Sequence, residues 1–183
     1  MSNRILFSLV ILLFLWACNP DKNRKVDQTT ISFATNDATK LFFKNVRRTY
    51  YEVEEMEAAK MEVYRLNKRV LSQERPIINL AIVNNWRFDE AYVMLEPNNL
   101  LDLANLTLTW KNPETDTRGE IVFENGNKET YVAFADQVYE QIQLGSQFTT
   151  EVQGVQYNVL EQSEDREAFR ITMVDYYRLV QRL

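Results

Sequence analysis

The stretch Ile77-Ile78-Asn79-Leu80-Ala81-Ile82-Val83 carries the strongest indication of the fold. Every residue in it except Asn79 is apolar, as expected for a strand that is buried on both faces. Pro76 precedes the run, and proline is tolerated at the start of a strand but not inside a central one. The stretch therefore predicts a β-strand in the centre of a sheet.

Further strands are predicted on both sides of this run. Residues 61–66 favour a strand before it, and Asn84-Asn85 marks a turn region after it. Residues 90–95 then provide a return strand, which ends at Pro97 and two asparagines. We expect the central strand and residues 90–95 to form a β-hairpin.

A second hairpin is predicted further along the chain. Apolar residues alternate with threonines over residues 106–110, which is the period of a strand with one buried face. Residues 112–119 form a polar loop, and Ile121 and Phe123 supply the facing apolar side chains. Residues 148–160 also favour a strand.

One helix is predicted over residues 128–144. Asn127 is a suitable N-terminal cap, and Gly145 lies where a left-handed residue often ends a helix. The apolar positions recur at intervals of three and four, as one helix face requires. They are Val132, Ala135, Val138, Tyr139 and Ile142.

Two segments fit both a helix and a strand. In residues 40–53, Phe42, Val46 and Tyr50 fit a helical stripe, whereas Leu41, Phe43 and Tyr51 fit a strand, so this choice stays open. In residues 168–180 the β-branched residues and the paired tyrosines favour a long strand. The fold class expected is α+β, with a mainly antiparallel sheet and about one packed helix, in a single domain over residues 31–183.

The N-terminus has the features of an export leader. Arg4 supplies a positive charge, and residues 5–16 are apolar apart from Ser8. This run is too short for a membrane-spanning helix, which needs about 20 residues, but it suits the apolar region of a signal peptide. Residues 1–17 are therefore predicted to be removed.

The end of the leader, Leu15-Trp16-Ala17-Cys18, resembles the lipobox of bacterial lipoproteins. The resemblance covers about the first eighteen residues and implies a diacylglyceryl group on the Cys18 thiol, cleavage before Cys18 and acylation of the new amine with a fatty acid such as palmitate. Two or three acyl chains anchor a protein stably in a membrane. Residues 18–30 then form a lipidated cysteine and a flexible tether, because residues 19–30 are polar.

The resemblance implies a location in the cell envelope, anchored to a membrane through the lipid on Cys18. The outer membrane is favoured. Asn19 and Asp21, which follow the cysteine where lipoproteins carry sorting signals, match no decisive signal. The periplasmic face and the cell surface therefore both stay open.

The composition excludes several functional classes. The chain of 183 residues has no histidine and one cysteine, so His-based triads, Cys-His pairs and thiolate metal sites cannot be built. Its four glycines are isolated, which excludes phosphate-binding and dinucleotide-binding loops. The net charge of −5 does not suit a nucleic-acid binder. No cofactor, no metal site and no catalytic residue is assigned.

The predicted turn after the central strand holds the candidate contact residues Trp86, Asp89, Glu90 and Tyr92. The first hypothesis is a non-enzymatic role, either in binding an envelope protein or a glycan or as a subunit of a larger envelope complex. The alternative is a carboxylate-dependent glycan-active enzyme, because Glu96 adds a third acid and aromatic rings stack on sugars. Such an enzyme needs two carboxyl groups roughly 5 to 9.5 Å apart.

The doublets Tyr50-Tyr51 and Tyr176-Tyr177 lie close to arginines. Tyrosine and arginine are enriched at binding hot spots, so the doublets are candidates for a contact surface. The competing interpretation is that one ring of each doublet faces the core and the other faces outwards.

Overall fold

Strand β3 (Ile78–Asn85) lies inside a four-stranded antiparallel sheet, as its apolar sequence predicts. The computed structural model describes Val26, residues 31–124 and residues 126–183. The strand order of this sheet, which we call sheet A, is β1-β2-β3-β4. Its other strands are β1 (Tyr51–Met56), β2 (Met61–Leu66) and β4 (Glu90–Pro97).

The predicted hairpin of β3 and β4 is confirmed, but its turn lies later than expected. Asn84 and Asn85 are the last residues of β3, paired with Ala91 and Glu90. The chain reverses over residues 86–89 instead. The reversal ends at Asp89, which has a positive φ of 52°, a conformation that Asp tolerates better than most side chains.

The second predicted hairpin is also confirmed and belongs to a second sheet, sheet B, with the order β6-β5-β7-β8. Leu108 faces Ile121 across β5 and β6, as the alternating pattern predicts. The strands are β5 (Thr107–Lys111), β6 (Arg118–Val122), β7 (Gln147–Val152) and β8 (Val155–Val159).

The prediction of one strand over residues 148–160 is wrong, because this segment folds back on itself as β7 and β8. Val152 pairs with Val155, so only Gln153 and Gly154 form the loop. Both have positive φ values, 52° and 79°, as the tightest hairpin turns require.

The helix predicted near residues 128–144 is confirmed as α3 (Lys128–Gln143). The side chain of Asn127 accepts a hydrogen bond from the backbone N–H of Thr130 at 3.2 Å, which caps the helix. Gly145 follows the helix with a φ of 76°.

The strand favoured for residues 168–180 is wrong, because this segment belongs to a second long helix, α4 (Ser163–Leu179). The helix is buried on most sides, so tertiary packing outweighs the strand preference of its β-branched residues. The Thr172 hydroxyl donates to the Ala168 carbonyl at 2.9 Å and thus finds a partner inside the helix. Glu164 and Asp165 in the first turn stabilise the helix, because negative charges interact favourably with the positive end of the helix dipole.

The open segment 40–53 contains both structures in succession. It begins in α2 (Asp37–Phe42), continues through a π-helical turn (Phe43–Arg47) and a 3-10 turn (Arg48–Tyr50), and enters β1 at Tyr51. Further 3-10 turns cover Glu57–Ala59 and Leu103–Asn105.

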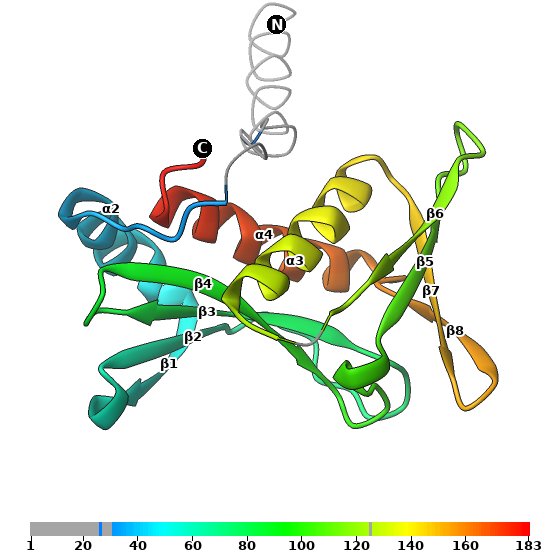
Figure 1. The fold of residues 1–183 in the computed structure, drawn as a ribbon, viewed down its shortest axis with the longest axis horizontal. Coiled ribbons are helices and arrows are strands. Elements are labelled where there is room, and N and C mark those ends of the chain that lie inside the picture. The colour runs from blue at the N-terminus through cyan, green and yellow to red at the C-terminus, as the bar shows by residue number, and fades with distance from the viewer. Residues whose placement is uncertain (1–25, 27–30, 125) are drawn as a thin grey trace, which may run out of the picture.

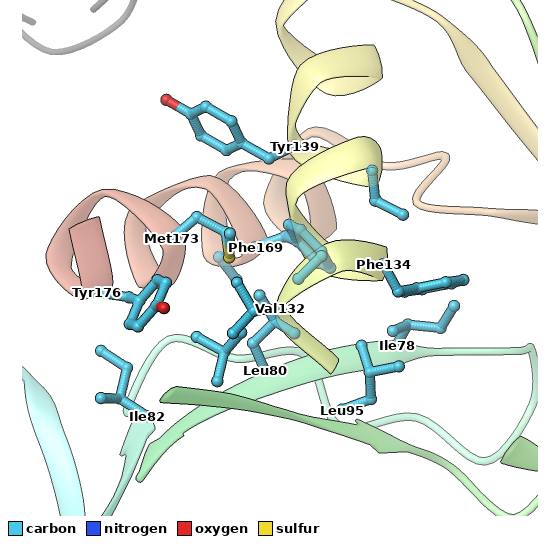
Figure 2. Close-up of a cluster of buried hydrophobic side chains, with 14 of the residues drawn as sticks. Ile78, Leu80, Ile82, Leu95, Val132, Phe134, Tyr139, Phe169, Met173 and Tyr176 are labelled. Atoms are coloured by element: carbon cyan, nitrogen blue, oxygen red, sulfur yellow. The ribbon is translucent and has the colours of Figure 1, made fainter. Parts of the chain in front are cut away.

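Helices α3 and α4 lie on one face of sheet A (Figure 1). The main core fills the space between these helices and the sheet. Figure 2 shows side chains of both helices directed towards Ile78, Leu80, Ile82 and Leu95 of this sheet. Buried residues of sheet B belong to the same cluster, so the two sheets and the helices form one α+β domain. These residues are Leu108, Ile121, Phe148 and Val159.

The predicted leader and tether, with Cys18, lie outside the described residues. Within the part of the chain that the structure describes, no helix combines the length and the hydropathy that a membrane span requires.

Candidate binding site

The turn between β3 and β4 presents Trp86 at the surface. The Trp86 backbone N–H donates to the Lys60 carbonyl at 3.1 Å, and the Lys60 ammonium lies 4.7 Å from the centre of the indole ring. Trp86 lines a hollow of about 560 Å³, which we call the Trp86 hollow. The other residues lining it are Lys44, Glu55, Glu57, Lys60, Met61 and Glu62.

Glu90 and Tyr92 line a different hollow of about 670 Å³, which we call the β4 hollow. Its apolar side chains are Phe88, Tyr92, Met94 and Tyr131. Asn85, Glu90, Lys128 and Glu129 add polar groups around them.

The two hollows have no lining residue in common. Tyr92 and Met94 alternate with Val93, which belongs to the main core under the helices, so they point to the other face. There they pack on the small buried cluster of Val63, Ala81 and Val83. Glu62, which pairs with Asn84, is two positions from the core residue Tyr64 on β2. The two side chains therefore point to the same, helix-covered face of the sheet. Trp86 and Tyr92 therefore do not share a site.

Glu90 is held by a lysine from the start of α3. The Lys128 ammonium lies 2.6 Å from Glu90 Oε2 and 4.6 Å from the centre of the Phe33 ring. This ion pair brings the N-terminal end of α3 to β4 and forms one wall of the β4 hollow.

The Tyr92 hydroxyl is a free hydrogen-bonding group within the described part of the chain. Partial burial raises the pKa of the Tyr92 phenol above its ordinary value, and the nearby Lys128 charge offsets this only in part. The phenol therefore stays protonated at neutral pH. It can donate and accept a hydrogen bond at the edge of an otherwise aromatic surface.

Asp89 is a turn residue that lines neither hollow. Its side chain accepts a hydrogen bond from the Lys40 ammonium at 2.7 Å, and its carbonyl accepts one from the Thr35 backbone N–H at 2.8 Å. These contacts attach α2 and the segment before it to the end of the turn. The structure thus brings Glu90 and Tyr92 together and separates Trp86 and Asp89 from them.

The three carboxylates of the enzyme hypothesis do not converge. Glu90 and Glu96 are six positions apart on the same strand, which separates their backbones by roughly 20 Å at about 3.3 Å per residue. Glu96 is bound by Arg65 Nε at 2.7 and 3.0 Å, while Asp89 and Glu90 each have their own lysine. Glu90 and Glu96 are therefore too far apart for the pair that glycoside hydrolysis uses, and Asp89 does not line the hollow that Glu90 lines.

Among the described residues, no group of three or more acidic, cysteine or histidine side chains is placed to hold a metal ion. Asn127 is the N-terminal cap of α3, and Glu129 lies in the first turn of this helix.

Several residues of the β4 hollow escape sequence analysis. Phe88 and Met94 are detectable in principle, because Phe88 lies in the predicted turn and Met94 shares a strand face with Tyr92. Tyr131 and Lys128 are not, since they come from α3 and reach β4 only through the tertiary fold.

Comparisons with known proteins find no counterpart: no protein-family model, no curated protein and no solved structure matches this chain.

Proposed function

We propose that this chain is a lipid-anchored envelope protein whose domain binds another envelope protein through the β4 hollow. Two features support the proposal. The leader and Cys18 resemble those of bacterial lipoproteins, and this favours attachment to a membrane. The β4 hollow offers an aromatic surface that the chain itself leaves exposed.

The observation that carries the binding role is the exposure of Phe88. This side chain is 62% exposed although it borders Tyr92, Met94 and Tyr131. Aromatic residues and methionine are enriched at the centre of protein interfaces, and a large exposed apolar patch marks an interaction site. The exposed Glu129 provides a polar group at the border of the hollow.

A protein partner fits this surface better than a glycan. Sugar rings stack on aromatic faces but also need several hydrogen-bonding groups directed at their hydroxyls. In the β4 hollow Glu90 and Lys128 are already engaged with each other at 2.6 Å, and Met94 offers no polar group. An aliphatic or aromatic side chain of a partner would fill the hollow beside the Tyr92 hydroxyl.

The anchor is tested by metabolic labelling with radioactive palmitate. The parent chain is expected to incorporate the label and a Cys18→Ser variant is expected to lose it. Equal incorporation in both would overturn the anchor.

The binding role is tested by affinity purification from gently solubilised envelopes, followed by mass spectrometry. We expect one stoichiometric partner that is lost in a Phe88→Ser, Tyr92→Ala double variant and kept in Leu144→Ser. Leu144 is a matched control because it is 52% exposed and lines neither hollow. A set of proteins unchanged by the double variant would overturn the assignment of the β4 hollow.

A further inference from the structure

A stripe of apolar side chains lies exposed on the first helical segment of the domain. We call Leu41, Phe42, Val46 and Tyr50 the N-terminal stripe. These side chains are 61%, 44%, 46% and 50% exposed, respectively. Together they occupy ten consecutive residues of α2 and the two turns that follow it.

The N-terminal stripe lies on the outward side of this helical segment. The opposite side of the segment packs against the rest of the domain. Phe43 is 3% exposed and packs edge-on against the Tyr64 ring at 4.9 Å between centres. Arg47, four residues later, binds the buried carboxylate of Asp175. Because this side is fixed, Phe42 and Val46 cannot turn inwards, and their exposure is a stable property of the fold.

The same ten residues carry two further cations, Arg48 and the exposed Lys44, which also lines the Trp86 hollow. Lys44 forms no ion pair within the described part of the chain, and Arg48 has only an exposed contact with Glu55 at 3.3 Å. An exposed pair of this kind contributes little, so Arg48 can exchange Glu55 for another anion. Aromatic and leucine side chains beside lysine and arginine are the pattern of segments that lie in a membrane interface.

The position of the stripe in the chain also favours a membrane as its partner. Cys18 and Ile31 are 13 positions apart (31 − 18), and a chain of that length extends to at most about 45 Å. The stripe begins ten positions after Ile31. Since tethering raises the effective concentration of the bilayer, a weak interfacial affinity is sufficient for docking.

We infer that the N-terminal stripe docks on the lipid surface to which Cys18 anchors the protein, with its apolar side chains at the acyl boundary and Lys44 and Arg48 at headgroup phosphates. This inference rests on the proposed lipid anchor and adds a second, non-covalent membrane contact. Docking at this segment orients the domain on the bilayer.

The test uses single cysteines in the lipidated protein. Cys18 is the one cysteine of the chain, and lipidation consumes its thiol, so an introduced cysteine is the only reactive site. Phe42→Cys and Val46→Cys are labelled with a polarity-sensitive dye, and Leu144→Cys is the control of similar exposure. The proteins are reconstituted in vesicles of phosphatidylethanolamine and phosphatidylglycerol that carry nitroxide-labelled lipids.

At positions 42 and 46 we expect the dye emission to shift to the blue on membrane contact, and the nitroxide-labelled lipids to quench most of it. At position 144 we expect neither change. Equal water exposure at all three positions would overturn the docking. Protection of 42 and 46 in native envelopes but not in vesicles would also overturn it, because a protein then covers the stripe. Near-ultraviolet circular dichroism verifies that the three cysteine variants are folded.

A failed anchor is distinguishable from failed docking. In the unsubstituted protein we expect no dye incorporation, because the Cys18 thiol is blocked. Dye incorporation there would contradict the anchor itself, whatever the labels at positions 42 and 46 report.

Discussion

Arg47 and Asp175 form a buried ion pair that joins the N-terminal helical segment to α4. Arg47 Nε lies 2.8 Å from Asp175 Oδ1 and 2.9 Å from Oδ2, and the Asp175 side chain is 1% exposed. The Tyr51 hydroxyl donates to the same carboxylate at 2.7 Å. These contacts hold α2 and the start of β1 against α4.

Removing Arg47 takes the nearest cation away from the buried Asp175 carboxylate, which keeps the Tyr51 hydroxyl and the more distant Arg178, 3.6 Å away. An Arg47→Leu variant is expected to lose about 3 kcal/mol of unfolding free energy, since breaking a buried pair from one side is strongly destabilising. Urea titration followed by circular dichroism measures the change. The neighbouring Arg48→Leu is the control, because among the described residues Arg48 pairs only with the exposed Glu55, and a change within about 0.5 kcal/mol is expected. Similar losses in both variants would contradict this role of Asp175.

Phe42 and Phe43 are adjacent in sequence and opposite in environment. Truncating Phe43 to alanine removes a ring from the core and is expected to cost about 3 to 5 kcal/mol. Phe42→Ala is expected to change the unfolding free energy by about 0.5 kcal/mol or less. Chemical denaturation of the two variants gives the comparison. Equal losses in the two variants would contradict the opposite environments of the two rings.

Gly119 is required by the close approach of Trp110. A Cβ atom at Gly119 would lie 2.9 Å from Cζ2 of the Trp110 indole, which pairs with it across β5 and β6. Gly119→Ala is expected to destabilise the domain by roughly 1 to 3 kcal/mol through overpacking. Gly126→Ala serves as the control, because its nearest neighbour would be an ordinary 3.5 Å away. Thermal unfolding separates the two, and an unaffected Gly119→Ala would show that the sheet adapts.

Four buried tyrosines are expected to make the domain less stable at alkaline pH. Burial raises the pKa of Tyr51, Tyr64, Tyr176 and Tyr177 above the ordinary value of 10.0. A pKa that is higher in the folded state gives stability that is complete below pH about 10 and is lost as the pH rises further. We expect phenolate absorbance of these four rings to appear together with unfolding. Reversible ionisation of all four with an unchanged circular dichroism spectrum would contradict their burial.

Local sequence signals predict the elements whose packing agrees with them. The run ending at Val83 is apolar on both faces and becomes an inner strand, and α3 has both its cap at Asn127 and its glycine at Gly145. In α4 the signals conflict, because residues such as Thr172 favour strands locally while the core selects a helix. Burial of a helix on nearly all sides also removes the polar face that periodicity detects.

The candidate site is only partly predictable for a related reason. Glu90 and Tyr92 are neighbours on one strand face, and alternation alone joins them. Trp86 is close in sequence but lies in another hollow, and Glu96 is on the same strand but far along it. The wall contributed by Tyr131 depends on how α3 packs against β4, which no local pattern encodes.

Site-specific photo-crosslinking from position 88 tests the proposed binding role most directly. A photoreactive amino acid replaces Phe88 in the lipidated chain within intact envelopes, and the same amino acid replaces Leu144 in the control. We expect one discrete crosslinked envelope protein from position 88 that is absent from position 144. No crosslink from position 88, or the same products from both positions, would contradict the β4 hollow as the partner-binding surface.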